Sequence, residues 1–150
     1  MIFTLMFIGG SAGSTGGGIK ISRHLLLVKN SWVELKRAIH PQAVIPVKFN
    51  GKSVSQQIIF NVMAFFLLYI MIFTTGVVVM ASIGMDFETS IGSVAATLGN
   101  IGPGIGSVGP VENYALFSPF AKWFLSFLML LGRLELFTVL IVISPAFWRS

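Results

Sequence analysis

One long apolar run limits what this chain can fold into more than any other feature. Residues 53–85 contain no charged side chain. A helix needs about 20 apolar residues to cross a bilayer, so this run is long enough to span one. Only 10% of all residues are charged, whereas a soluble domain carries about 25%. The run therefore predicts an all-α integral membrane protein; a soluble domain with one apolar core helix is the alternative.

The distribution of charge predicts how the chain is oriented in the membrane. Most lysines and arginines precede the apolar run, whereas Asp86, Glu88 and Glu112 follow it. Because cytoplasmic loops carry an excess of lysine and arginine, residues 29–56 and the C-terminus are expected in the cytoplasm and residues 85–118 outside. Orientation in a multi-pass protein thus accounts for the net charge of +5, and nucleic acid is not an expected partner.

The segments around the run predict a pore-loop unit. Residues 57–84 are expected to form a spanning helix, residues 87–98 a short helix and residues 119–148 a return helix. A short helix of about 12 residues cannot cross a bilayer. The glycine-rich loop at residues 100–104 follows it. Such a loop presents carbonyl oxygens that replace the hydration shell of a cation.

The start of the chain looks like the second half of an earlier unit. An apolar segment too short to span runs into a glycine-rich stretch that ends at Gly18. Alignment of the two loops places Gly13 over Gly102, each after an apolar helix end and before a second helix. A flexible linker is the alternative for the first loop.

Three domains follow from this pattern. Residues 1–40 are expected to hold the pore-helix end, loop and inner helix of the earlier unit. Residues 41–56 are expected to form a cytoplasmic connection, with a possible hairpin around Asn50 and Gly51. Residues 57–150 are expected to form a complete unit, so the chain holds about one and a half units.

The sequence offers no support for an enzyme. A GxGxxG match begins at Gly104, but Pro110 follows it instead of the helix that a dinucleotide site requires. The stretch from residue 13 to residue 20 lacks the GK[ST] ending of a phosphate-binding loop. The chain has no cysteine and no Ser/His/Asp set. Neither catalysis nor a bound cofactor is therefore predicted.

Two ionisable residues lie near the middle of the expected return helix. Arg133 and Glu135 are two positions apart, so they do not face each other on a helix. Charged groups at membrane depth usually face protein or water and often serve function. A functional role and a structural salt bridge to another helix are both open from the residues alone.

Three stretches together resemble the Trk/Ktr/HKT superfamily and, within it, the TrkH family of bacterial potassium uptake subunits: GGSAGSTGGGIK, TLGNIGPGIG and LLGRLELFTVLIVISPAFW. The resemblance covers the whole chain. It implies four helix–pore-loop–helix repeats that form a potassium-channel-like pore, with Gly13 and Gly102 as the central filter glycines of the third and fourth repeats. The residues implied to bind K⁺ through backbone carbonyls are Ser11, Ala12, Gly13, Asn100, Ile101 and Gly102.

The resemblance also implies a gate and partners. A broken inner helix within residues 16–40 would form an intramembrane gate loop, and Arg133 would face it. Family membership implies a bacterial inner-membrane location among lipids, a homodimer and a cytosolic nucleotide-binding subunit of the TrkA type. Channel-like transport and symport with protons or sodium both stay open.

The expected function is potassium uptake as the C-terminal part of a TrkH-like pore subunit. The alternatives are a truncated fragment that does not transport and a small membrane protein that modulates another pore.

Overall fold

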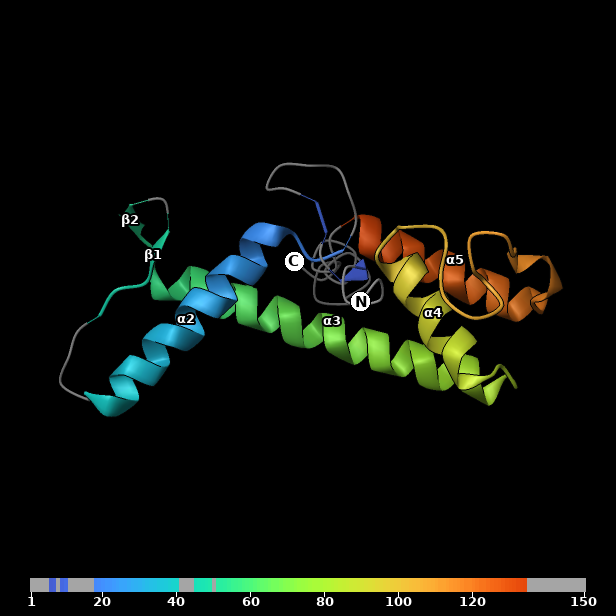
Figure 1. Cartoon of the computed structure of the whole chain (residues 1–150), viewed down its shortest axis with the longest axis horizontal. Coiled ribbons are helices and arrows are strands. Elements are labelled where there is room, and N and C mark those ends of the chain that lie inside the picture. Colours follow the sequence, from blue (N-terminus) through green and yellow to red (C-terminus); the bar gives the residue numbers. More distant parts are fainter. Residues whose placement is uncertain (1–5, 8, 11–17, 41–44, 50, 135–150) are drawn as a thin grey trace, which may run out of the picture.

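A computed structural model of the chain describes residues 6–7, 9–10, 18–40, 45–49 and 51–134. One long helix, α3 (Gln56–Ser82), runs along the molecule (Figure 1). Helix α2 (Ile21–Ile39) packs against the first part of α3. Helices α4 (Phe87–Leu98) and α5 (Pro119–Arg133) pack together beside its last part.

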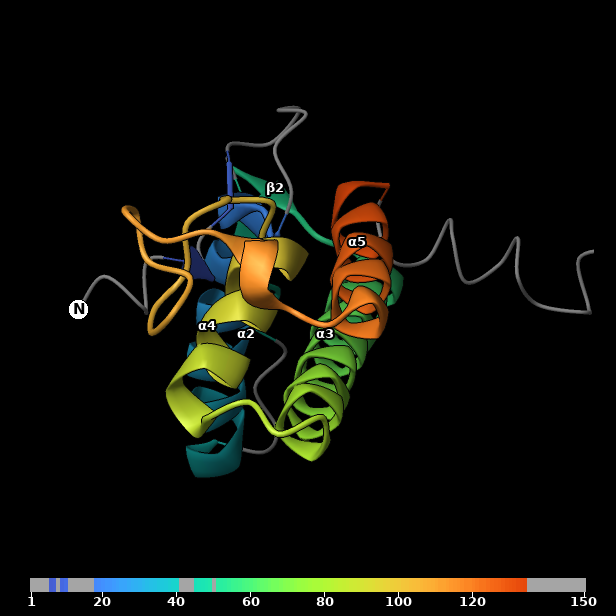
Figure 2. The same ribbon diagram turned by 90° about the vertical axis from the view of Figure 1, so that its right-hand side faces the viewer.

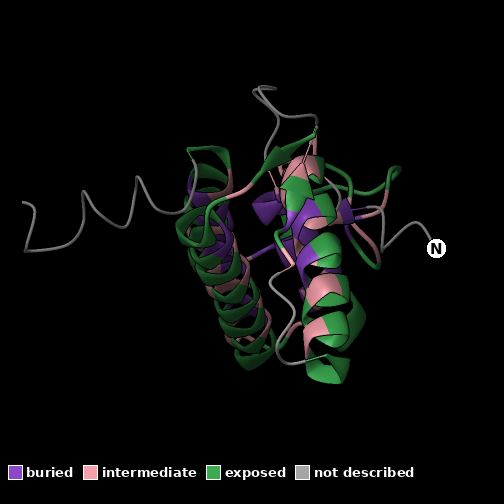
Figure 3. Ribbon diagram, turned by 90° about the vertical axis from the view of Figure 1, so that its left-hand side faces the viewer, coloured by how far each residue is buried: buried purple, intermediate pink, exposed green. Residues whose placement is uncertain are grey.

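Helix α3 is the apolar run of the sequence. Its 27 residues reach a mean hydropathy of 2.5, and of the helices in the described residues it alone is long and apolar enough to cross a membrane. At 1.5 Å per residue its length is about 40 Å, which exceeds a hydrocarbon core of about 30 Å. Much of its surface is exposed (Figure 3). Its bounds agree with the prediction of residues 57–84 to within two residues.

Helix α4 is short, polar in part and almost wholly buried. Asp86 caps its start by accepting a hydrogen bond from the backbone N–H of Thr89 at 3.0 Å, and this bond lowers the pKa of the Asp86 carboxyl. The hydroxyls of Ser93 and Thr97 donate to backbone carbonyls one turn earlier in the helix. Because these hydroxyls are satisfied within the helix, α4 can lie in an apolar core without a partner for them elsewhere.

The core forms where α3, α4 and α5 meet. Helix α4 packs against both α3 and α5, and it lies to one side of both when the molecule is seen from its end (Figure 2). At Gly76 of α3, an added Cβ would come within 3.0 Å of Val94 and 3.3 Å of Leu128. A glycine here lets the three helices approach closely. The buried residues of this core include Tyr69, Met80, Val94, Leu98, Leu125 and Leu128.

A small hairpin packs beside the crossing of α2 and α3. Strand β1 (Lys48–Phe49) pairs antiparallel with β2 (Lys52–Ser53), with Gly51 in the turn between them. Gly51 has a φ of +78°, which glycine adopts readily. The hairpin predicted at this turn is therefore present, and Val47 before it packs on α2 and α3.

One sequence prediction is wrong for the described residues, and another extends beyond them. The resemblance implied a broken helix within residues 16–40, but α2 is continuous from Ile21 to Ile39, so no break lies in that range. The return helix was predicted to reach residue 148; α5 accounts for Pro119–Arg133, and residues 135–148 lie outside the described part of the chain.

Candidate functional site

The loop at residues 100–104, called the filter loop below, begins where α4 ends. Asn100 adopts a positive φ of 54°, and its N–H donates to the carbonyl of Thr97 at 3.0 Å. The N–H of Ile101 donates to the carbonyl of Ala96 at 2.9 Å. This pair of bonds is a Schellman motif, which ends a helix and turns the chain away from its axis. The carboxyl end of α4, which favours cations, therefore lies at the filter loop.

After the filter loop, the chain folds back onto α4. A Cβ on Gly104 would lie 2.7 Å from the carbonyl oxygen of Gly92, and a Cβ on Gly92 would strike the backbone of Ile105. Only glycine at both positions permits this approach. The N–H of Ser107 donates to the hydroxyl of Thr89 at 3.0 Å, which fixes the returning chain to the start of α4.

The centre of the filter loop is open on one side. Ile101, Gly102 and Pro103 are exposed in this chain. Gly102 has a φ of +102°, and a Cβ there would meet nothing within 4 Å. Glycine is thus favoured at position 102 because of the positive φ, and not because a side chain would clash with a neighbour. A carbonyl-lined ion path needs open space beside a backbone whose peptide groups can take the required orientation.

The side chain of Asn100 ties the filter loop to α5. Its amide Nδ2 donates to the carbonyl of Met129 at 3.0 Å. One turn later, Gly132 lies directly against the carbonyl oxygen of Leu98. From the sequence, only the backbone carbonyl of Asn100 was predicted to have a role, and this side-chain contact was not predicted. The available signal was that asparagine adopts a positive φ more readily than other residues with a side chain.

Arg133 lies beside this contact at the end of α5. Residues four positions apart share a helix face, so Arg133 lies on the same side of α5 as Met129, the side that meets Asn100. The side chain of Arg133 is exposed in this chain. The structure thus brings the predicted gating residue to the level at which α4 ends and the filter loop begins.

The first glycine-rich loop is described only at its base. The N–H of Gly9 donates to the carbonyl of Ile19 at 2.9 Å, and the N–H of Ile21 donates to the carbonyl of Gly10 at 3.2 Å. These bonds close the loop on itself, whereas the filter loop continues into a long connection to α5. A Cβ on Gly18 would lie 3.7 Å from Gly99, so the base lies against the end of α4. The predicted ion-binding residues Ser11, Ala12 and Gly13 lie outside the described residues.

Side-chain metal ligands do not gather anywhere in the described ranges. No group of three histidine, aspartate or glutamate residues there could hold a metal ion. Apart from the side-chain amide oxygen of Asn100, the oxygens of the filter loop are backbone carbonyls. Hard cations bind oxygen ligands, so these carbonyls have the chemistry that the sequence predicted for K⁺.

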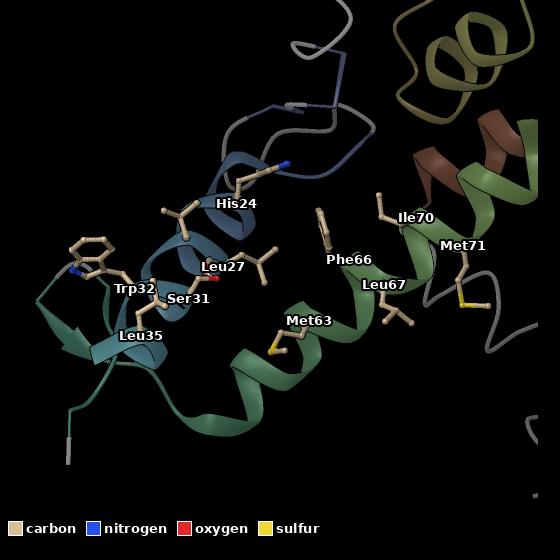
Figure 4. Close-up of a pocket in the computed structure, with 11 residues that line it drawn as sticks. His24, Leu27, Ser31, Trp32, Leu35, Met63, Phe66, Leu67, Ile70 and Met71 are labelled. Carbon is tan, nitrogen blue, oxygen red and sulfur yellow. Dashed lines mark hydrogen bonds between the residues drawn. The ribbon is translucent and has the colours of Figure 1, made fainter. Parts of the chain in front are cut away.

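A groove of about 780 Å³ lies between α2 and α3, at a distance from the filter loop (Figure 4). Trp32 and Leu35 line it from α2, and Met63 and Phe66 line it from α3. Most of the lining side chains are apolar and none is a carboxylate. A desolvated cation would find few oxygen ligands there, so the groove is not the ion site.

Comparison with known proteins decides the family. The family model "TrkH: Cation transport protein" matches residues 1–150. The chain belongs to the TrkH family. It is 46% identical over 144 residues to the Trk system potassium uptake protein TrkH of Salmonella typhimurium, which covers 96% of this chain and 29% of that protein. It is 43% identical over 150 residues to TrkH of Halomonas elongata, of which it covers 31%.

A solved structure of the TrkH family has the same fold. The crystal structure of the potassium transporter TrkH from Vibrio parahaemolyticus superposes with a TM-score of 0.89 at 43% identity, over 99% of this chain and 31% of that one. The predicted fold class, an all-α integral membrane protein with a helix–pore-loop–helix unit, is thereby confirmed. The chain spans 29–31% of the length of these relatives.

Proposed function

We propose that this chain supplies the fourth filter strand and part of the third repeat of a potassium uptake pore in the membrane. The filter loop carries the proposal: it starts at the carboxyl end of a buried short helix and holds Gly102 at a positive φ beside open space. Its supports are the 43–46% identity to proteins named for potassium uptake and the crystal structure of a potassium transporter.

In the proposed pore, K⁺ is held by backbone carbonyls and no cofactor takes part. The carbonyls of Asn100, Ile101 and Gly102 replace part of the water around the ion. Ser11, Ala12 and Gly13 are proposed to supply the adjacent strand. The remaining strands correspond to the part of the relatives that this chain does not span.

The charge pattern supports an orientation and a regulatory partner. The basic residues within 29–56, in α2 and the hairpin, are proposed to lie in the cytoplasm of a bacterial cell, below its inner membrane. A cytosolic nucleotide-binding subunit of the TrkA type and a second copy of the transporter are the proposed protein partners. The basic residues proposed to lie in the cytoplasm are Lys29, Lys36, Arg37, Lys48 and Lys52.

A chimaera tests the proposed function. Residues 1–150 would replace the matching segment of the Vibrio parahaemolyticus TrkH, in a bacterial strain that lacks its own potassium uptake systems. Because 99% of the chain aligns with that protein, we expect growth at low K⁺ and K⁺-selective uptake, as with the parent transporter. A chimaera that reaches the membrane at normal levels and takes up no K⁺ would contradict the proposal. Uptake without preference for K⁺ over Na⁺ would remove the filter assignment.

Arg133 is proposed to control the rate of transport. Arg133 follows Gly132, which lies against the end of α4, and a positive charge held near the start of the filter loop would raise the electrostatic energy of a passing cation. We expect Arg133→Ala to change the K⁺ flux of the chimaera by about fivefold or more, in the direction of faster flux. Arg133→Lys keeps the charge and should stay close to the unmodified rate. Equal flux in Arg133→Ala and the unmodified chimaera, over a range of K⁺ concentrations, would exclude this role.

A further inference from the structure

We infer that Tyr114 is a positioning residue that sets the ion selectivity of the filter loop. Tyr114 lies in the short 3₁₀ turn Tyr114–Leu116, in the outer connection between α4 and α5. Its phenol O–H donates to the carbonyl oxygen of Gly102 at 3.0 Å. The two partners are twelve positions apart in sequence, so this bond joins the filter loop to a separate part of the chain.

The peptide group between Gly102 and Pro103 needs such a bond. Proline has no N–H, so this peptide group can be held by hydrogen bonding only through its carbonyl. Gly102 restricts its own dihedral angles less than any other residue would. Nothing packs within 4 Å of the position where a Cβ of Gly102 would lie. The Tyr114 bond is therefore the contact that fixes the direction of this carbonyl on its open side.

Tyr114 is itself held in place. Its ring packs edge to face on Phe117 at 5.4 Å between centroids, and Phe117 belongs to the buried core. From α5, the ammonium of Lys122 donates to the carbonyl of Ala115 at 2.7 Å. Partial burial raises the pKa of the Tyr114 phenol, which favours the protonated O–H that donates to the Gly102 carbonyl. The turn thus holds a fixed donor against the filter loop.

Selectivity between K⁺ and Na⁺ depends on the number and direction of the carbonyl oxygens around the ion. A carbonyl held by Tyr114 keeps one direction, whereas a free one could turn toward a smaller ion. Asn100, through its bond to Met129, holds the other end of the same loop. This role rests on the proposed function, because it requires that ions pass the filter loop.

The test is the K⁺/Na⁺ preference of the chimaera that carries Tyr114→Phe, measured as the ratio of half-saturating concentrations. Loss of one partly exposed hydrogen bond should reduce the preference for K⁺ by about two- to tenfold. The amount of protein in the membrane should stay the same. Tyr69→Phe is the matched control, because it makes the same chemical change at the other tyrosine, in the core of α3. Its ratio should not change.

The outcomes separate this role from the proposed function. An unmodified chimaera that does not select K⁺ would contradict the proposed function. A selective chimaera whose ratio is unchanged by Tyr114→Phe, or shifted equally by Tyr69→Phe, would overturn the role of Tyr114 alone. If Tyr114→Phe does not accumulate, Lys122→Met provides the second test, since it removes the bond to Ala115. Loss of this exposed charge affects K⁺ and Na⁺ equally, so only a shifted ratio supports the role and an unshifted one overturns it.

Discussion

Replacing Gly132 with alanine should reduce potassium uptake by the chimaera more than tenfold. A Cβ on Gly132 would strike the carbonyl oxygen of Leu98, and it would lie 2.9 Å from the carbonyl carbon of the same residue. It would also lie 3.0 Å from Nδ2 of Asn100. The obstacle is mostly backbone in a buried helix end, so no side-chain rotation can relieve it. Overpacking of this kind costs about 1–3 kcal/mol, and more when backbone must move.

The loss should reach the filter loop through one bond. If α5 moves away from Leu98, Met129 moves with it, and the bond from Asn100 to the Met129 carbonyl lengthens. We therefore expect uptake to fall more than tenfold even for the protein that reaches the membrane. This fall corresponds to a transport barrier that is higher by about 1.4 kcal/mol or more. Uptake per transporter, with quantified membrane protein, is the measurement.

Gly109→Ala is the matched control for Gly132→Ala. The nearest atom to a Cβ on Gly109 is the carbonyl oxygen of Gly106 at 3.6 Å, which is an ordinary contact. The same chemical change is thus made in the same unit without a clash. Near-normal uptake by Gly132→Ala would show that α5 and α4 separate without effect on the filter loop.

The helices of the described residues were largely predictable from the sequence because hydropathy and capping act locally. The absence of charge over residues 53–85 marks α3, and Asp86 followed by small residues marks α4, which has the predicted bounds of residues 87–98. A bilayer cannot accept an unpaired backbone, so a long apolar run has few alternatives to a helix. The glycine and asparagine after α4 likewise mark its end through the dihedral angles that they allow.

The contacts that hold the filter loop could not be predicted in this way. The bonds from Asn100 to Met129 and from Tyr114 to Gly102 join residues 29 and 12 positions apart. Their formation depends on how α4, α5 and the outer turn pack, and periodicity carries no information on that packing. Tyr114 is one of only two tyrosines in the chain, but nothing near it in the sequence indicates its partner.

The equivalence of the two glycine-rich loops also stays a prediction. Their flanks share an order of apolar end, glycines and helix, which is what the sequence alignment detected. In the part of the chain that the structure describes, backbone bonds between residues 9–10 and 19–21 close the base of the first loop, whereas in the filter loop the N–H of Gly104 donates to the carbonyl of Val108, farther along the connection to α5. Glycine content reports where the backbone is permissive, and it does not distinguish one kind of loop from another.

Substitution of Gly102 should have the most specific effect on selectivity. Gly102→Ala introduces no clash, because nothing lies within 4 Å of the added Cβ. It does place a side chain at a φ of +102°, a conformation that costs about 1–3 kcal/mol for residues other than glycine. The loop can relieve this strain by rotating the peptide groups whose carbonyls are proposed to face the ion. We therefore expect Gly102→Ala to lose most of its preference for K⁺, and Gly102→Asp to lose K⁺ uptake altogether, since its carboxylate would hold the cation.

Gly51→Ala separates strain from a role in the filter. Gly51 has a φ of +78°, and nothing lies within 4 Å of a Cβ there, so alanine is strained in the same way and equally free of clashes. It lies in the β1–β2 hairpin, beside the crossing of α2 and α3 and away from the helices α4 and α5 that flank the filter loop (Figure 1). If backbone strain alone impaired the transporter, both variants would lose K⁺ preference. Because we assign Gly102 to the ion path, the K⁺/Na⁺ ratio should fall only in Gly102→Ala, and an equal ratio in the two variants would refute that assignment.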